Sequence, residues 1–280
     1  MLSSCIRHCL IVMVLLAHCL QGLLTSLLPL STKIRLRIRV FCTHLLSKAI
    51  LKLMQVTCYY EMSHVQFLPM QNKGRLVVSN HQSVIDILLI SAFKPCVFIT
   101  SQEVNETPIV GFLARAGGCI FVERRNKEHL SKDISQLIDV LSQGFDVVLF
   151  AEGTTSDGSG LLPFKTGLFK SVIKTKHATQ PMTIQFLSLG GSSVTSAMRD
   201  RLFYFGDHKI TDHLKNIFNN PPLKVRVLIH GLVFSHLYTD AKLLANAVRS
   251  RVEEFYLPTK AVASDRDNST IKSNCQFRLA

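Results

Sequence analysis

Residues 77–86 read VVSNHQSVID and place one histidine and one carboxylate where a predicted strand turns into a predicted helix. The β-favouring run at 75–78 precedes this stretch, and an apolar helical segment at 84–92 follows it. His81 therefore lies just before a helix N-terminus. Asp86 follows five residues later, which on one continuous helix is about 140° away. The two side chains can meet only if His81 lies in the turn and reaches back over the first helical turn.

A histidine held by a carboxylate in this way can act as a base. The carboxylate would hold one imidazole nitrogen and leave the other free to take a proton from a substrate hydroxyl. The same stretch also fits a structural interpretation, because Ser83 is a good N-cap residue and Ser83-x-x-Asp86 matches a capping box. Both interpretations of Asp86 stay open on these residues alone.

Strand-like and helix-like segments alternate from residue 75 onward, which predicts an α/β fold with a mostly parallel, twisted sheet flanked by helices. The expected strands cover residues 75–80, 96–100, 118–123, 146–151, 182–188 and 224–231. The expected helices cover residues 83–92, 108–116, 128–143, 165–176 and 240–256. We expect this α/β domain to span residues 59–256, and the polar tail at 257–280 to be disordered.

An N-terminal membrane-associated helical segment is expected to precede that domain, within residues 1–58. Residues 8–32 contain no Asp, Glu, Lys or Arg, and a run of this length can cross a bilayer core of about 30 Å. A secretory signal peptide is the alternative, but no small-x-small cleavage site follows before Lys33. His18 and Pro29 make an imperfect span, so a re-entrant or interfacial helix also stays open.

The net charge of +13 is concentrated beside this apolar run, because residues 1–60 carry seven basic residues and no acidic one. The cluster at 33–39 follows the run directly, so the positive-inside rule predicts a catalytic domain on the cytoplasmic face of a membrane. Anionic lipid headgroups suit this charge better than nucleic acid, because no zinc-finger, RNP or helix-turn-helix pattern is present. Residues 40–58 have helical apolar spacing and predict an amphipathic helix on the membrane or on the domain, with a plain core helix as the alternative.

The eight cysteines are scattered along the chain, without a C-x2-C pair or a His/Cys cluster at zinc spacing. We therefore expect reduced, mostly buried thiols and no metal site. No Walker or dinucleotide glycine pattern is present, and we expect no bound cofactor.

Three further blocks combine strand ends with charged or hydroxyl side chains. The run GCIFVERR at 118–125 ends in paired arginines, which at the carboxyl edge of a sheet would suit a phosphate, although both could be solvated surface residues. The run LFAEGTTSDG at 149–158 offers a sharp turn at Gly153 and hydroxyl groups that can line an anion site, although it also fits an ordinary turn. The run PFKTG at 163–167 adds a cation, Lys165.

The order and spacing of these blocks resemble the motif series of the 1-acylglycerol-3-phosphate acyltransferase family of glycerolipid acyltransferases. The blocks are NHQSVID at 80–86, GCIFVER at 118–124, FAEGTTS at 150–156, PFKTG at 163–167 and a β-run that begins at Pro181. The resemblance covers about residues 60–235. It implies an α/β domain behind a short N-terminal membrane-associated helical segment.

The resemblance implies an enzyme that moves an acyl group from acyl-CoA or acyl-carrier protein to the hydroxyl of a lysolipid. In that role His81 would be the general base and Asp86 its orienting partner. The residues implied in the acceptor-phosphate site are Phe121, Arg124, Glu152, Gly153 and Thr154, with Lys165 as a further cation and Pro181 shaping the acyl side. The acceptor we place first is 1-acylglycerol-3-phosphate, which would give phosphatidate in phospholipid biosynthesis.

Two positions depart from the family pattern F-P-E-G-T-R-S, because Ala151 and Thr155 stand in place of the proline and the arginine. The variant EGTTSDG is similar to a bacterial branch that includes lyso-ornithine lipid acyltransferases, whose acceptor has no phosphate. A lyso-ornithine lipid O-acyltransferase is therefore the alternative, and a non-catalytic membrane lipid-binding protein is the alternative from another class. The expected partners are membrane lipids, the lysolipid acceptor and the acyl thioester donor, with no nucleic acid.

Overall fold

The computed structural model describes residues 4–63, 74–123, 127–259 and 276–278. The helices of these residues are α1 (Ser4–Leu27), α2 (Thr32–Leu53), α3 (Ile85–Phe93), α4 (Gln102–Glu106), α5 (Pro108–Ala116), α6 (Leu130–Ser142), α7 (Lys170–Thr175), α8 (Arg199–Leu202), α9 (Ile210–Phe218) and α10 (Ala241–Glu253). The strands are β1 (Val56–Met62), β2 (Leu76–Ser79), β3 (Val97–Ser101), β4 (Ile120–Val122), β5 (Val147–Phe150), β6 (Ala178–Leu189), β7 (Ser192–Ser193), β8 (Leu223–Ile229), β9 (Val233–Phe234) and β10 (Gln276–Arg278).

The strands join in one sheet of order β10-β1-β8-β6-β2-β5-β3-β4, and the short strands β7 and β9 pair with β6. The run β6-β2-β5-β3-β4 is parallel throughout, whereas β8 pairs with β6 in antiparallel orientation. The predicted α/β class with a mostly parallel sheet is confirmed. All six expected strands occur, with ends shifted by up to four residues.

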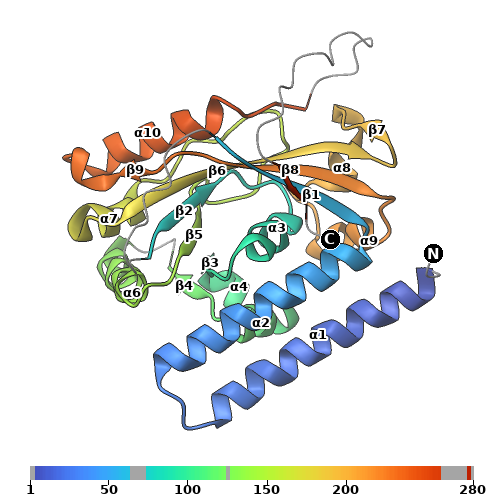
Figure 1. Cartoon of the computed structure of the whole chain (residues 1–280), viewed down its shortest axis with the longest axis horizontal. Helices are drawn as coiled ribbons and strands as arrows, with labels where there is room; N and C mark the ends of the chain where they lie inside the picture. The colour runs from blue at the N-terminus through green and yellow to red at the C-terminus, as the bar shows by residue number, and fades with distance from the viewer. Residues whose placement is uncertain (1–3, 64–73, 124–126, 260–275, 279–280) are drawn as a thin grey trace.

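The central strands are apolar on both sides because helices cover both faces of the sheet. In β2, Val77 packs into one hydrophobic cluster with α3, whereas Leu76 and Val78 pack into the other with α6 and α10. The neighbouring strand β5 alternates in the same way. Continuous apolar runs are typical of parallel strands buried on both faces. Figure 1 shows the resulting layers, with α3 on one face of the sheet and α6, α7 and α10 on the other.

The amphipathic helix predicted at 40–58 is wrong at both ends. Helix α2 begins at Thr32, so it includes the basic cluster, and it ends at Leu53. Gln55 then adopts a φ of 58°, a left-handed conformation that ends the helix. The next residues include β-branched and aromatic side chains, and they form β1, which pairs with β8 along its whole length. Consequently, the expected boundary between the N-terminal segment (1–58) and the α/β domain (59–256) falls inside β1.

The predicted disordered tail lies largely outside the described residues, which omit 260–275 and 279–280. Of the remainder, β10 pairs with β1 in antiparallel orientation.

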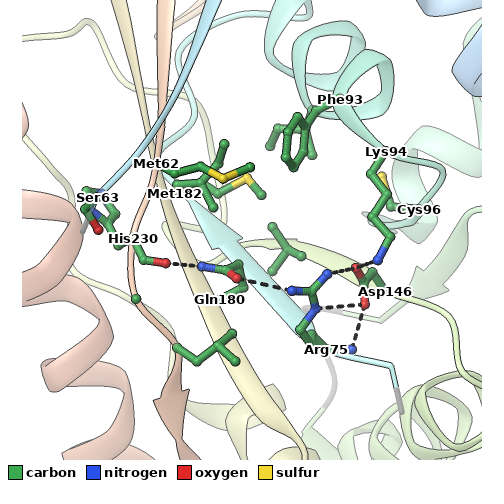
Figure 2. A pocket seen from close by; sticks show the side chains of 15 residues that line it. Met62, Ser63, Arg75, Phe93, Lys94, Cys96, Asp146, Gln180, Met182 and His230 are labelled. Atoms are coloured by element: carbon green, nitrogen blue, oxygen red, sulfur yellow. Dashed lines mark hydrogen bonds and ion pairs between the residues drawn. The ribbon is translucent and has the colours of Figure 1, made fainter. Parts of the chain in front are cut away.

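An ion cluster around the buried Asp146 carboxylate joins the amino ends of three parallel strands. Asp146, directly before β5, accepts the backbone N–H of Arg75 at 2.9 Å, and its other oxygen contacts the Arg75 guanidinium at 2.8 Å. The ammonium of Lys94 lies 2.7 Å from the same carboxylate. Figure 2 shows both cations converging on Asp146 beside a pocket of about 230 Å³. Because β2, β3 and β5 begin here, the cluster lies at the sheet edge opposite the carboxyl ends of these strands.

The substitution Asp146→Asn is expected to lower the free energy of unfolding at pH 7 by roughly 1–3 kcal/mol, since it removes the negative charge shared by two cations and sets an NH2 group against one of their donors. Burial alone would raise the pKa of Asp146, but the hydrogen bonds and charges of Arg75 and Lys94 outweigh it and lower the pKa. The stabilisation is therefore present above the ordinary carboxyl pKa and lost as the pH falls through the lowered value. Thermal unfolding measured from pH 7 to pH 2 should show the midpoint of the wild-type protein converging with that of the Asp146→Asn variant as the pH falls.

The exposed Asp139 on α6 provides the control for this experiment. Asp139→Asn should leave the midpoint nearly unchanged at every pH. A midpoint difference for Asp146→Asn that does not vary with pH would attribute the effect to packing rather than charge.

Candidate active site

The carboxyl ends of β2 and β5 lie side by side, because the two strands pair in parallel with Ser79 opposite Phe150. The turn that follows β2 carries Asn80 and His81, and the turn that follows β5 carries Glu152. These turns meet, since the backbone N–H of His81 donates to Glu152 Oε1 at 2.8 Å. The motif that follows β2 and the one that follows β5 are therefore parts of one site at the edge where open α/β sheets place ligands.

His81 and Asp86 are in direct contact. The Nδ1 atom of His81 lies 2.9 Å from Asp86 Oδ2. The contact forms because His81 lies in the turn, while Asp86 points back from the first turn of α3. With Nδ1 occupied by the carboxylate, Nε2 is the ring nitrogen left for a substrate, and the His81 side chain is 16% exposed.

Asp86 both orients His81 and holds the turn before α3, and only one half of the expected capping box forms, because the Asp86 N–H donates to the Ser83 carbonyl and not to its hydroxyl. Its Oδ2 atom also accepts the backbone N–H groups of Gln82 at 2.7 Å and Ser83 at 2.8 Å. The side chain is completely buried. Amide donors at a helix N-terminus stabilise an ionised carboxylate. The negative charge that faces His81 is therefore held by the backbone of the turn itself.

The imidazole of His81 is restrained on its face as well as at its edge. Its ring stacks on Phe150 with 3.8 Å between centroids and 10° between planes. The backbone carbonyl of His81 accepts the N–H of Ser156 at 2.9 Å. These contacts come from β5 and the loop after it, so the motif that follows β5 helps to fix the position of the His81 ring.

Polar neighbours of His81 tie the turn to the rest of the sheet. Asn80 bridges to β6, accepting from the N–H of Ile184 at 2.8 Å and donating to its carbonyl at 3.0 Å. Gln82 donates to the hydroxyl of Tyr256 at 2.9 Å, and its carbonyl accepts the N–H of Tyr204 at 2.8 Å. The turn is therefore anchored on both sides of His81.

Glu152 uses both carboxylate oxygens on backbone amides. Oε1 accepts from His81, and Oε2 accepts from the N–H of Leu162 at 2.8 Å. The residue is 2% exposed, and burial raises its pKa to about 7, although the two N–H bonds act to lower it. This geometry makes Glu152 a support for the His81 backbone, whereas the acceptor-binding role implied by the family resemblance stays a prediction.

The other residues expected at the acceptor site differ in position. Gly153 turns the chain after β5 with a φ of 76°. The exposed Lys165 packs against this turn, since a Cβ added to Gly153 would lie 3.3 Å from its Cγ. Thr154 is exposed beside them. Phe121 lies in β4 and faces a pocket between that strand and the N-terminal helices, and Arg124 falls outside the described residues.

His213 is a residue of this site that the sequence analysis did not single out. It lies on α9, is 2% exposed, and places Nε2 3.2 Å from the Ser83 hydroxyl and 3.5 Å from the Val84 N–H. Burial lowers its pKa to about 4, so the neutral ring can accept these bonds at neutral pH. The apolar spacing of Ile210, Leu214 and Ile217 could have revealed the helix, but no local pattern indicates what His213 contacts.

Comparisons with known proteins show the family to which the chain is related. The family profile described as Acyltransferase matches residues 59–185. The lyso-ornithine lipid O-acyltransferase of Brucella abortus is 35% identical over 63% of this chain and 69% of the relative, and that of Rhizobium meliloti is 30% identical over 64% of each. The 1-acyl-sn-glycerol-3-phosphate acyltransferase of Neisseria gonorrhoeae is 37% identical over 38% of this chain and 41% of the relative.

The fold is also similar to a solved structure, the crystal structure of the 1-acyl-sn-glycerophosphate acyltransferase from Thermotoga maritima. The TM-score is 0.61 at 19% identity, over 90% of this chain and 95% of the other. Fold and site define an α/β enzyme with a histidine–carboxylate pair at a strand-to-helix turn. The chain belongs to the acyltransferase family, and it is an O-acyltransferase.

The substitution Glu152→Gln tests whether this residue positions His81. An amide would set an NH2 group against one of the two backbone N–H donors, and a mispaired buried group costs about 1–3 kcal/mol. We expect kcat to fall by about tenfold while the KM for the acceptor stays nearly unchanged. Steady-state kinetics with varied acceptor concentration would measure both.

The matched control is Asp157→Asn, in the same loop but paired with Arg199 rather than with His81. This variant should keep the wild-type kcat. A higher KM at constant kcat for Glu152→Gln would instead show that Glu152 binds the acceptor.

Proposed function

We propose that this enzyme transfers an acyl group from a thioester donor to the hydroxyl of a lysolipid, with His81 as the general base. The observation that carries the proposal is the buried Asp86 carboxylate bound to His81 Nδ1 at 2.9 Å. Nε2 takes the proton of the acceptor hydroxyl as its oxygen attacks the thioester carbonyl. The ionised Asp86 stabilises the imidazolium that forms. The proton then passes to the departing thiolate, which leaves as a free thiol.

The donor is an acyl thioester, acyl-CoA or acyl-carrier protein, as the family resemblance implies. This chemistry suits the site, because an attacking hydroxyl needs a base and a thiolate is a good leaving group. The described residues contain no group of three His, Cys, Asp or Glu that could hold a metal ion. Every step assigned above is made by His81, Asp86 and the substrates.

We place lyso-ornithine lipid ahead of lysophosphatidate as the acceptor, which reverses the order inferred from the sequence. The Brucella and Rhizobium relatives, at 35% and 30% identity over 63% and 64% of this chain, carry the name lyso-ornithine lipid O-acyltransferase. The relatives named 1-acyl-sn-glycerol-3-phosphate acyltransferase match either a shorter part, 38% of this chain for Neisseria gonorrhoeae, or at lower identity, 27% over 67% of this chain for Arabidopsis thaliana. In addition, Thr155 stands where the family pattern has an arginine suited to phosphate. Lysophosphatidate stays the second candidate, because the exposed Lys165 can still contact a phosphate.

The enzyme associates with a membrane, and we propose that α1 lies in the plane of one leaflet. This helix is long and apolar enough to cross a bilayer. However, its contacts with the protein run along its length, from Arg7 bound to Gln55 at 2.9 Å to Arg39 bound to Ser26 at 2.6 Å. A helix fastened to the domain near both ends cannot pass through the membrane away from it.

The outward surface of this region is apolar, as an in-plane helix requires. The exposed apolar side chains are Val12, Met13, Leu16, Leu20, Leu23, Leu24 and Leu27 on α1, Phe41 and Leu45 on α2, and Ile109 and Phe112 on α5. Figure 1 shows α1 and α2 as a hairpin along one side of the molecule. The basic residues around it favour the anionic cytoplasmic leaflet, so we propose that the active site faces the cytoplasm.

The reaction is tested with purified protein in neutral detergent, an acyl-CoA or acyl-carrier protein donor, and a panel of lysolipids. Release of free thiol should require both substrates. His81→Ala should lower kcat by about 10²–10⁴-fold, the range for losing a general base, with little change in the unfolding midpoint. His236→Ala, which removes an exposed histidine, should have no effect. An absence of thiol release with every pair would favour the non-catalytic lipid-binding protein.

The same assay decides the acceptor. A tenfold higher kcat/KM for one acceptor, equal to about 1.4 kcal/mol, identifies it. We expect lyso-ornithine lipid to be preferred, and Thr155→Arg to improve kcat/KM only for lysophosphatidate. A wild-type preference for lysophosphatidate would restore the order inferred from the sequence.

The in-plane placement predicts that both ends of α1 are accessible from one side of the membrane. The probes are the exposed Cys5 and a new cysteine from Thr32→Cys, each as the single cysteine of its variant. In sealed inverted vesicles, a membrane-impermeant maleimide should label both probes. Labelling of the two ends from opposite sides would show that α1 spans the bilayer.

A further inference from the structure

A groove of about 410 Å³ lies where the N-terminal hairpin meets the edge of the sheet. Its walls come from α1, α2, α5, α6 and the segment leading into β4. The lining includes Arg35, Arg39, Arg115, Leu23, Phe112 and Phe121. Gly22 lets α1 approach closely, since a Cβ added there would lie 2.4 Å from the Cβ of Ala116. The groove is therefore framed by packed helices.

The groove is strongly cationic. Three guanidinium groups line it and no carboxylate does. Within the described part of the chain, none of the three forms an ion pair. Guanidinium groups brought together without carboxylates repel one another, so an anion in the groove would be stabilised.

The three arginines differ in the donors that they still have available. Arg39 is used by the fold, because it donates to the carbonyls of Gly22 and Arg115 and to the hydroxyls of Thr25 and Ser26. Arg35 uses one terminal nitrogen on carbonyls of the turn between α1 and α2.

Arg115 uses one terminal nitrogen on Asn105. Each of Arg35 and Arg115 keeps a second terminal nitrogen without a partner among the described residues. Two guanidinium groups with donors to spare suit the oxygens of a phosphate.

The surroundings of the groove are apolar and exposed. Leu23 and Phe112 in its walls are 49% and 37% exposed, and Ile109 beside them is 76% exposed. These side chains belong to the surface that we place against the bilayer. A ligand here would have its charged group between the arginines and its hydrocarbon on the apolar rim, which is the chemistry of an anionic lipid.

We propose that this groove binds the headgroup phosphate of one anionic membrane phospholipid, which is not a substrate and which fastens the anchor to the catalytic domain. The proposal rests on the proposed membrane placement of α1. The same chemistry would also suit the phosphate of the acceptor, because Phe121, one of the residues implied in the acceptor-phosphate site, lines the groove. We favour the bulk phospholipid because the groove opens on the lipid-facing surface.

The first test uses the wild-type protein and phosphatidylglycerol as the probe. Native mass spectrometry of protein taken from vesicles of equal phosphatidylglycerol and phosphatidylcholine should show one retained phosphatidylglycerol per chain. The inactive His81→Ala variant should retain it equally, so the result is independent of catalysis. Protein without retained phosphatidylglycerol would overturn the proposal.

The second test compares two charge-matched double variants. Arg35→Gln with Arg115→Gln removes the available donors of the groove, whereas Lys33→Gln with Arg37→Gln removes two exposed charges of α2 outside it. The groove variant should bind vesicles containing phosphatidylglycerol about tenfold more weakly than the control variant, as expected for losing charge-assisted bonds to a phosphate. Equal losses in the two variants would overturn the proposal, because they would reflect general surface charge.

Acceptor kinetics in neutral detergent separate the two occupants. The groove variant should keep the wild-type KM for both lysolipid acceptors. A KM for lysophosphatidate raised about tenfold, with the KM of the control variant unchanged, would assign the groove to the acceptor and overturn the proposal.

Discussion

The carboxylate of Asp86 is the point on which the active site depends. One of its oxygens binds the imidazole of His81 and the amides of Gln82 and Ser83. The turn, the start of α3 and the orientation of the His81 ring are therefore set by one buried carboxylate. The remaining contacts of the turn come from β5, β6 and α9, and they exclude water from the Asp86 carboxylate and hold its partners in place. Hydrogen bonds to this carboxylate are stronger in such a low-dielectric environment.

Much of the fold could be predicted because the central strands are short apolar runs with turn residues at their ends. The same feature placed the motifs after β2 and β5 at one edge of the sheet. The sequence did not predict β1, because the helical spacing before it continues into Val56 and Cys58. What ends the helix is the left-handed conformation of Gln55, which a glycine at that position would indicate but a glutamine does not.

The site was predictable where function lies in one stretch and unpredictable where it depends on contacts between distant elements. His81 and Asp86 are five residues apart, so a local argument could join them. Glu152 is 71 residues from His81, and its bond to the His81 backbone depends on the pairing of β2 with β5. His213 is 130 residues from Ser83 and reaches it only because α9 folds back under the turn.

The junction between the hairpin and the sheet leaves little room for a hinge. Only Met54 and Gln55 separate α2 from β1, and Arg39 binds α1 and the end of α5 at once. The α1–α2 hairpin and the sheet edge that carries His81 must therefore move as one rigid unit. With α1 in one leaflet as proposed, the depth at which a lipid hydroxyl lies in that leaflet becomes a selection criterion, because His81 cannot move along the bilayer normal independently of α1 and α2.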